Sequence, residues 1–419
     1  MLRKTDVAGG LGQSKALKTC RILSRGGKAA ALPGTGRRSI GCRDHGFDGA
    51  RRILLFLVVA MLALIFLAAP ARAGEGPAAT APTTEPWSKE KAWQWYHYQP
   101  WPCGFNYVPA NAISYTEMWQ DYAFEPERID REMALAQGVG FNCTRVVLPF
   151  VVWEAEPEAF KKRLDVFLGI CQRRGIKVMF ALFDDCVFGP IEDPVFGRQP
   201  EVVAGWYANG WAPSPGHKLA RDPGSWPRLE KYVKDVIGQF KADGRVWVWD
   251  LYNEPGNSGM GQASVPLVEK VFQWAREVGP VQPLTVGQWS GEANFGQSLN
   301  ALIYRESDII TFHDYGKAPG LAGHIQRLAL HGRPMICTEW LNRNTGSIAA
   351  DCLPVFQKTA VGAMNWGLVN GKTQTHLNWG HRPGQPDPKQ WQHDLFRPDL
   401  TPYDARELEL FAAAIKAMH

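Results

Sequence analysis

Two glutamates in this sequence come directly after apolar runs that have the composition of buried β-strands. Glu254 follows Asn253 in "VWVWDLYNEPGN" (246–257), and Glu339 ends the run in "PMICTEW" (334–340). Two identical carboxyl groups in different surroundings can divide the roles of acid and base. Cleavage of a glycosidic bond requires such a division, because one carboxylic acid protonates the departing oxygen and a second carboxylate meets the positive charge at the anomeric carbon.

Further polar and aromatic residues follow other strand-like runs. They are Arg145 in "NCTRVVLPF", His313 and Tyr315 in "TFHDYG", and Trp366 in "MNWGLV". An arginine near Glu339 would keep that carboxylate ionised, whereas a shielded Glu254 near a negative neighbour would have a raised pKa and hold its proton. The two glutamates would then take opposite roles in catalysis.

Each of these residues also has a purely structural interpretation. Glu254, which precedes Pro255, could cap the helix that follows, and Glu339 could belong to a structural ion pair. His313 could be a core histidine and Tyr315 a packing aromatic. Arg145 could pair with a surface acid, and Trp366 could be a core tryptophan. These alternatives would have to hold together at matching strand ends, which favours a common site.

The chain repeats one rhythm, a short β-rich run followed by a loop and a longer helical pattern. Strands are predicted at 103–108, 143–148, 177–182, 246–251, 283–287, 308–313, 334–338 and 361–366. Helices are predicted between or after them, for example at 126–138, 158–175, 225–244, 266–279 and 403–419.

Eight strands that alternate with helices predict an α/β fold, a single (β/α)8 TIM barrel with some long loops. The alternative is a doubly wound open sheet, which would usually have fewer strands and a glycine-rich phosphate loop that is not found here. In a barrel the active site forms at the carboxyl ends of the strands. The residues singled out above would therefore converge on one mouth.

"WDLYNEPGN" and "CTEW", framed by "TFHDYG" and "MNWGLV", resemble clan A of the glycoside hydrolases, and most of all the cellulase-type enzymes of family 5. The resemblance covers the chain from the first strand to its end. It implies a retaining hydrolase of a β-linked glycan of the xylan, mannan or glucan type. Glu254 matches the acid/base and Glu339 the nucleophile of a double displacement, for which the carboxyl groups lie about 5–5.5 Å apart.

The resemblance also implies roles in substrate binding. Asn253 matches the amide that bonds the sugar 2-hydroxyl, and Arg145 and Tyr315 match the groups that bond the nucleophile. His313 matches a subsite histidine beside the acid/base, and Trp366 the platform under the sugar.

One feature departs from the family pattern, and the loops leave the sugar undefined. Family 5 enzymes commonly carry a histidine at the end of strand three, but "FALFDDC" offers Asp184 and Asp185, which suggests that Asp185 or Asp184 bonds sugar hydroxyls. Long segments at 184–225 and after strand eight could block one end of the cleft, although an open groove is also compatible with the sequence. Six loop tryptophans could stack on sugar rings: Trp153, Trp206, Trp211, Trp289, Trp340 and Trp379.

The first 92 residues differ in composition from the rest. Residues 1–73 form a basic leader with 13 Lys/Arg and three Asp/Glu, and 53–69 is an apolar run followed by Ala71-Arg72-Ala73. This is typical of a signal peptide, or of a retained N-terminal anchor, so export to the periplasm or outside the cell is expected. Residues 74–92 are predicted to be a linker, and 93–419 the catalytic domain.

Composition limits the partners. Without the leader the chain carries 33 Lys/Arg and 38 Asp/Glu, which argues against nucleic acid. Beyond the leader the six cysteines have no metal-site spacing, and Cys143 and Cys337 lie in apolar runs that favour buried thiols. We expect an oligosaccharide or polysaccharide as substrate, no cofactor or metal, and membrane contact only through a retained anchor. A second hypothesis is a catalytically inactive carbohydrate-binding barrel of the cell envelope.

Overall fold

The computed structural model describes residues 84–290 and 292–418. Eight parallel strands form a closed barrel in chain order, and β8 pairs with β1. The strands are β1 (Cys103–Asn106), β2 (Cys143–Val147), β3 (Lys177–Asp184), β4 (Val246–Asn253), β5 (Leu284–Gln288), β6 (Ile310–His313), β7 (Met335–Trp340) and β8 (Gly362–Asn365). The chain therefore has the predicted (β/α)8 architecture, and every predicted strand is present.

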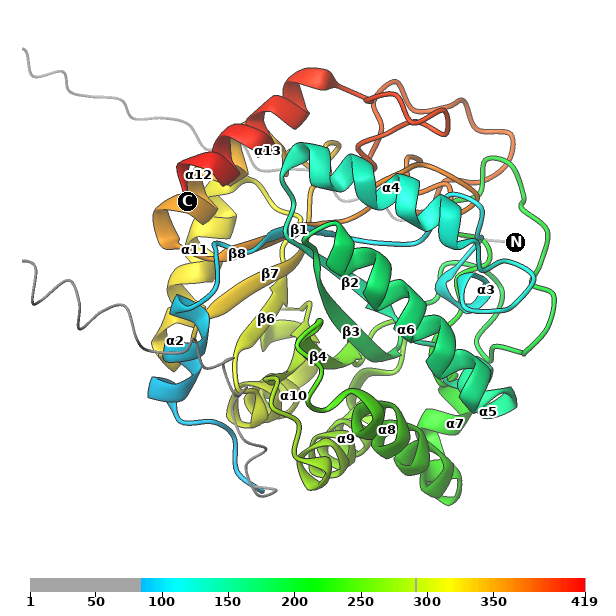
Figure 1. Cartoon of the computed structure of the whole chain (residues 1–419), viewed down its shortest axis with the longest axis vertical. Helices are drawn as coiled ribbons and strands as arrows, with labels where there is room; N and C mark the ends of the chain where they lie inside the picture. Colours follow the sequence, from blue (N-terminus) through cyan, green and yellow to red (C-terminus); the bar gives the residue numbers. More distant parts are fainter. Residues whose placement is uncertain (1–83, 291, 419) are drawn as a thin grey trace, which may run out of the picture. The chain divides into compact units, whose positions relative to one another are not determined.

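Helices surround the barrel, as Figure 1 shows. They are α2 (Lys89–His97), α3 (Tyr115–Met118), α4 (Pro126–Val139), α5 (Phe150–Ala155), α6 (Pro157–Arg173), α7 (His217–Arg221), α8 (Trp226–Phe240), α9 (Val265–Val278), α10 (Glu292–Glu306), α11 (Ala318–Leu328), α12 (Ala349–Thr359) and α13 (Ala405–Ala417). Short 3-10 turns lie at Pro223–Ser225, Gly261–Ser264 and Ala329–His331. The helices predicted at 126–138, 158–175, 225–244, 266–279 and 403–419 correspond to α4, α6, α8, α9 and α13.

Helix α2 lies at the amino-terminal end of the barrel and corrects the last part of the predicted linker at 74–92, whose residues 74–83 lie outside the described residues. The Trp93 indole donates to the carbonyl of Gly332 (3.0 Å), and the Tyr96 hydroxyl donates to the carbonyl of Ala360 (2.8 Å). Trp95 stacks on Trp247 of β4 with ring centroids 5.6 Å apart. Residues from about 87 onward thus belong to the folded domain, because their aromatic side chains cover an apolar barrel end.

The carboxyl ends of the strands are irregular, which affects where their side chains point. The register of β4 and β5 shifts between Asp250 and Asn253, and that of β7 and β8 shifts between Cys337 and Trp340. Such irregularities redirect side chains at barrel rims. Glu254 follows β4 with a φ of 45°. This left-handed conformation lets Asn253 and Glu254, which are neighbours in sequence, both line the same cavity.

The six cysteines of the described region are all buried and unpaired: Cys103, Cys143, Cys171, Cys186, Cys337 and Cys352. This agrees with the prediction of buried thiols at Cys143 and Cys337. In the described part of the chain, no helix has the length and apolar character needed to cross a membrane. The leader and the apolar run at 53–69 lie outside the described residues.

Candidate active site

A cavity of about 600 Å³ lies at the carboxyl ends of the strands. Its polar part includes Asn253, Glu254, His313 and Glu339, from β4, β6 and β7. Aromatic side chains make up much of its wall: Phe188, Tyr207, Trp211, Trp289, Tyr315, Trp366 and Trp379. A concave apolar cavity with a few convergent polar groups is the usual form of a small-ligand site.

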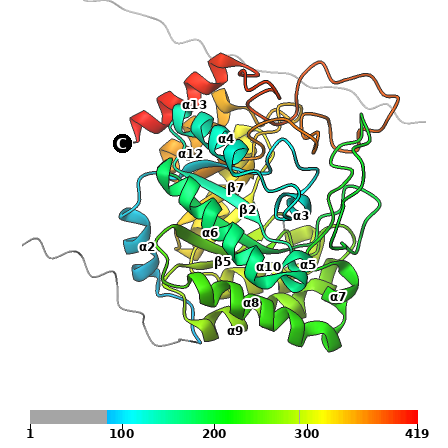
Figure 2. The ribbon, with the colours of Figure 1, turned by 45° about the vertical axis from the view of Figure 1, so that its right-hand side comes forward.

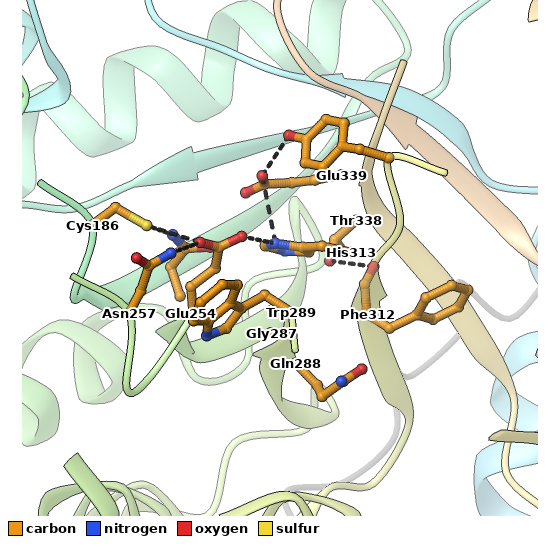
Figure 3. A network of polar contacts seen from close by, with 12 residues as sticks. Cys186, Glu254, Asn257, Gly287, Gln288, Trp289, Phe312, His313, Thr338 and Glu339 are labelled. Atoms are coloured by element: carbon orange, nitrogen blue, oxygen red, sulfur yellow. Dashed lines mark hydrogen bonds and ion pairs between the residues drawn. The ribbon is translucent and has the colours of Figure 1, made fainter. Parts of the chain in front are cut away.

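The two predicted carboxylates face each other across His313 (Figure 3). His313 Nδ1 lies 2.6 Å from Glu254 Oε1 and 3.4 Å from Glu339 Oε2. A carboxylate oxygen of Glu254, a carboxylate oxygen of Glu339 and a ring nitrogen of His313 all lie within 4.8 Å of one another. The barrel therefore brings together two groups that are 85 positions apart in the chain.

Glu339 is held by two strong donors. Arg145 donates from Nη1 to Glu339 Oε1 at 2.9 Å, and the Tyr315 hydroxyl donates to Oε2 at 2.8 Å. Arg145 is itself fully buried and forms an ion pair with Asp250 at 2.6 Å. Removing the guanidinium would leave buried carboxylates uncompensated, which typically costs about 3–5 kcal/mol of stability.

Glu254 has different partners. The Cys186 thiol donates to its Oε2 at 3.0 Å, and the Asn257 side-chain amide also donates to Oε2. Figure 3 shows these two residues on one side of Glu254 and His313 on the other. Because its carboxylate contacts side chains rather than the amides of the next helix, Glu254 does not act as a helix cap.

Burial is the largest influence on the ionisation of the pair. It raises the pKa of Glu254, and it raises the pKa of Glu339 to about 7, with a further contribution from the charge of Glu254. Burial also lowers the pKa of His313 to about 4, so that the imidazole is neutral at pH 7. The raised pKa of Glu339 differs from our expectation that Arg145 alone would keep this carboxylate ionised, because the desolvation of both groups outweighs the ion pair.

Because the pKa of both carboxyl groups is raised, the two groups can share a proton. Its position follows from the hydrogen-bond donors. Arg145 and Tyr315 both donate to Glu339, and a guanidinium is a permanent donor of charge-assisted hydrogen bonds. Glu254 is contacted by a thiol, which is a weak donor, by the neutral Asn257 amide and by a neutral imidazole, so that none of its partners carries a positive charge. We therefore assign the shared proton to Glu254.

Asn253 and Trp366 also lie where the sequence predicts. The Asn253 Oδ1 accepts from Arg145 Nη2 at 2.6 Å, and its Nδ2 donates to Asp184 at 2.8 Å, which fixes the amide. Trp366 lines the cavity and packs against Trp211 with ring centroids 5.4 Å apart. The Nε1 of Trp366 and the Nε2 of His313 are buried and have no hydrogen-bond partner among the described residues.

Asp185 does not line the cavity. Its carboxylate accepts from the Tyr252 hydroxyl at 2.6 Å, from the Gly256 amide at 2.8 Å and from Ser264. Asp184 likewise bonds protein groups, including the Trp211 indole at 2.9 Å. The expectation that either aspartate bonds sugar hydroxyls is therefore not met, because both carboxylates are engaged in holding the loops after β3 and β4.

The loop tryptophans divide into two groups. Trp211, Trp289 and Trp379 line the cavity, as expected for sugar platforms. The other three do not: Trp153, Trp206 and Trp340. Trp153 bonds Asp235, and Trp340 packs between Phe356 and Phe411.

Sequence reasoning did not single out Cys186 or Asn257 as site residues, although both line the cavity and contact Glu254. Cys186 lies two residues beyond the end of β3, in the same "FDDC" stretch that drew attention to the aspartates. The missed signal was its position just after a strand end, which it shares with Glu254 after β4 and Tyr315 after β6.

The grouping of Glu254, His313 and Glu339 also offers three ligand atoms of the kind that bind divalent cations. A cation bound there would lie near the Arg145 guanidinium, which is 2.9 Å from Glu339. Like charges at this range repel strongly in a buried site. The charge distribution therefore favours an acid/base pair over a cation site.

A closed (β/α)8 barrel with two buried carboxylates facing each other at its mouth fits a hydrolase that uses acid/base catalysis. The family model described as "Cellulase (glycosyl hydrolase family 5)" matches residues 108–380, which is well over half of the chain. The chain therefore belongs to glycosyl hydrolase family 5 and is a glycoside hydrolase. Among curated proteins, none matches it significantly.

Solved structures share the fold at low sequence identity. GH5_18 from Streptomyces cattleya, in complex with GlcNAc, has a TM-score of 0.54 and 14% identity, covering 76% of this chain and 80% of that one. The endo-β-1,4-mannanase from Thermotoga petrophila has a TM-score of 0.51 and 15% identity, covering 77% and 78%. An exo-β-1,4-mannosidase from an Opitutaceae bacterium has a TM-score of 0.52 and 16% identity, covering 75% and 59%.

The contact between Cys186 and Glu254 leads to a prediction about pH dependence. A donor to the carboxylate favours its charged form, so the thiol lowers the pKa of Glu254 against the larger effect of burial. We expect Cys186→Ala to move the alkaline limb of kcat/KM to higher pH, because Glu254 then keeps its proton longer. The rate at the optimum should change by no more than about tenfold, which corresponds to one ordinary hydrogen bond of about 1 kcal/mol, because Glu254 is protonated there.

Cys186→Ser is the matched control, because its hydroxyl restores a donor of similar size. Its alkaline limb should lie at or below that of the wild type. The measurement is kcat/KM against pH for the three proteins on one aryl β-glycoside. If the alkaline limb is the same in all three, the thiol does not influence the proton donor.

Proposed function

We propose that this enzyme is a retaining β-glycosidase in which Glu339 is the nucleophile and Glu254 the acid/base. The observation that carries this proposal is the close approach of the two carboxylates, with oxygens within 4.8 Å of each other on either side of His313. Retaining enzymes have carboxyl groups about 5–5.5 Å apart, whereas inverting enzymes need about 6.5–9.5 Å to admit a water. The short spacing supports double displacement.

In the first step Glu339 attacks the anomeric carbon, and Glu254 gives its proton to the departing glycosidic oxygen. A glycosyl ester on Glu339 forms, and the aglycone leaves as an alcohol. Because the ester of Glu339 carries no charge, it no longer repels a negative charge on Glu254, and the pKa of Glu254 falls. Glu254 can then accept a proton from the incoming water, which attacks the ester and restores both carboxyl groups.

The remaining site residues support this sequence of steps. The buried Arg145 and Tyr315 orient Glu339 and stabilise it when it leaves as a carboxylate. Trp366 offers an indole face and a free Nε1 to the sugar at the cleavage point. The neutral His313 holds Glu254 in place and does not add a second positive charge beside Glu339.

The substrate class that fits is a β-linked glycan of the mannan, glucan or xylan type. Aromatic platforms suit pyranose rings, since their C–H faces pack on π systems. Because structures of the same fold include mannanases and a mannosidase, β-mannosides are the first compounds to test. The alternative, a barrel that binds carbohydrate without cleaving it, would have the same platforms but would not need the paired carboxylates.

The test is hydrolysis of a panel of aryl β-mannosides, β-glucosides and β-xylosides, followed by proton NMR of the first product. The proposal expects turnover of at least one member and release of the β-anomer before mutarotation. Release of the α-anomer would contradict double displacement. Binding of glycans by the wild type with no turnover of any panel member would instead favour the non-catalytic barrel.

We also propose that residues 1–73 direct export through the apolar run at 53–69 and are removed. The composition of this segment supports a signal peptide, with two arginines before the apolar run and Ala71-Arg72-Ala73 after it. Expression of the full chain in a bacterial host should give a mature protein that starts at Gly74, as read by N-terminal sequencing. A full-length protein that stays in the membrane fraction would indicate an anchor instead.

A further inference from the structure

Two long loops at the mouth of the barrel are bonded to each other. One connects β3 to α7 and the other connects β8 to α13, and both lie at the end of the barrel away from α2 (Figure 2). We call their contacting segments, residues 203–208 and 373–382, the latch. The amide of Ala208 donates to the carbonyl of Thr373 (2.9 Å), and His381 Nδ1 lies 2.6 Å from the carbonyl oxygen of Gly205.

Gln374 bridges the latch with both ends of its side-chain amide. Its Oε1 accepts from the Gly205 amide at 2.9 Å, and its Nε2 donates to the carbonyls of Val203 (2.9 Å) and Trp206 (3.1 Å). The Arg382 guanidinium lies over the Trp206 ring, 4.8 Å from its centroid. The latch therefore ties two loops together that are about 170 residues apart in the chain.

The latched loops place a wall across one side of the cavity. Tyr207 and Trp211 come from the first loop, and Trp366 begins the second. Trp211 is fixed by its hydrogen bond to Asp184 and packs on Trp366. Behind these two indoles, over β1 and β2, remains a space of about 20 Å³. That volume is about the size of one water molecule and far too small for a sugar ring.

The side of the cavity at the end of β4 lies across the closed barrel from β8, since these two strands are four positions apart in the order of eight, and its rim is exposed. Asn257 and Trp289 are half-buried at its rim, next to the exposed Ser258 and Gly259. Trp379 belongs to the latch segment 373–382, and its ring is 42% exposed beside Tyr315, where the latch meets the mouth of the cavity. Glu254, which must face the leaving group to protonate it, belongs to the loop that ends at this open rim.

The direction of the substrate follows from these two sides. In a 1,4-linked pyranose the C4 hydroxyl lies across the ring from the anomeric carbon. When the leaving group extends past Glu254 toward Asn257 and Trp289, the C4 hydroxyl points toward Trp211 and Trp366. A further sugar attached at C4 would collide with this wall.

We propose that the enzyme acts on the non-reducing ends of β-1,4-linked chains and releases one terminal sugar at a time, because the latched loops close the cavity behind the residue being cleaved. This inference rests on the proposed glycosidase function and adds its mode of action. An enzyme that cuts within chains would instead need a groove open at both ends.

The test uses the wild-type enzyme and three pentasaccharides, of β-1,4-linked mannose, glucose and xylose, each labelled at the reducing end. Each is supplied free and with a methyl cap on the terminal O4. We expect monosaccharide and labelled tetrasaccharide as the first products, and at least about 100-fold slower cleavage of the capped form, because steric exclusion acts directly on kcat/KM. First products of two or more residues, or cleavage of the capped and free forms at similar rates, would overturn the inference.

Failure of the proposed function has a different signature, since it would show as no turnover of any aryl glycoside as well. Gln374→Ala gives an independent test, because it removes three hydrogen bonds of the latch and should raise the rate on the capped form relative to the free form. The matched control is Gln199→Ala, since Gln199 lies on the first loop outside the latch and its side-chain amide donates to the carbonyls of Val195 and Gly197 of that loop. An unchanged ratio for Gln374→Ala in a folded protein would contradict the role of the latch.

Discussion

Replacement of Glu339 by glycine lowers kcat on an aryl β-glycoside by at least about 10⁴-fold, which corresponds to about 5.4 kcal/mol of lost transition-state stabilisation. The reason is that no other side chain at this face of the cavity is held by both Arg145 and Tyr315, which orient a carboxylate toward the anomeric carbon. The measurement is steady-state hydrolysis, with circular dichroism to confirm that the variant is folded.

Azide distinguishes loss of the nucleophile from general damage. It can occupy the space left by the Glu339 carboxylate and attack the anomeric carbon from the face opposite the leaving group. One inversion then gives an α-glycosyl azide. Recovery of turnover with the β-azide as product, or a rate loss below about tenfold without azide, would be incompatible with the assigned role.

Glu132→Gln is the matched control for both glutamates. Glu132 is buried in α4, where it accepts from the Tyr107 hydroxyl at 2.8 Å, and it does not line the cavity. Burial raises the pKa of Glu132 to about 7, so that the amide resembles the protonated form. Activity of this variant should stay within about twofold of the wild type, as is usual for changes away from the reacting groups.

Replacement of Glu254 by alanine has an effect that depends on the leaving group. Without a proton donor, kcat/KM on a substrate with a poorly acidic aglycone falls by about 10²–10⁴-fold, the usual contribution of general acid catalysis. A dinitrophenyl leaving group needs no proton, so the glycosyl ester on Glu339 should still form. Its hydrolysis becomes rate-limiting because no base activates the water.

Azide should then attack that ester from the leaving-group side. Two successive inversions give a β-glycosyl azide, the opposite anomer to the one expected for the Glu339 variant. The measurement is product NMR together with rates on three substrates of graded leaving-group acidity. Equal rate losses on all three substrates would mean that Glu254 does not donate the proton.

Much of the fold follows from the sequence because barrel strands have a strong local signal. Each is a short apolar run, buried by the interior on one side and by helices on the other, and each is followed by a helix with its own periodicity. The start of helix α2 falls within the predicted linker, whose Gly, Pro, Ala and Thr residues at 74–86 show no periodicity. The role of α2 depends on contacts with residues far away in the chain, such as Trp247, Gly332 and Ala360.

The residues of the site were predictable where their position at a strand end defined them. Asn253, Glu254, His313 and Glu339 meet at one mouth because parallel barrel strands all end there. Asp185 was mistaken for a sugar ligand, since sequence cannot tell which of two successive aspartates turns toward the cavity. In the structure its carboxylate faces Tyr252 and Ser264, under the loop after β4.

Two properties of the site depend on tertiary packing alone. The pKa of Glu339 is raised by burial, which depends on tertiary packing and not on a local sequence pattern. This effect of burial is larger than the opposite effect of the adjacent Arg145. The latch joins loops without regular structure through side-chain hydrogen bonds such as the three of Gln374. Loop pairing of this kind has no periodicity for sequence analysis to detect.

The proposed mechanism requires that a glycosyl ester forms on Glu339 and is hydrolysed with help from Glu254. The decisive experiment incubates the wild-type enzyme with 2,4-dinitrophenyl 2-deoxy-2-fluoro-β-glycosides of mannose, glucose and xylose, then digests it and sequences the labelled peptide by mass spectrometry. We expect one fluoroglycosyl group, attached to Glu339 in the peptide that contains "CTEW". Attachment at another residue, or turnover of the parent glycosides through the α-anomer with no label at all, would contradict this mechanism.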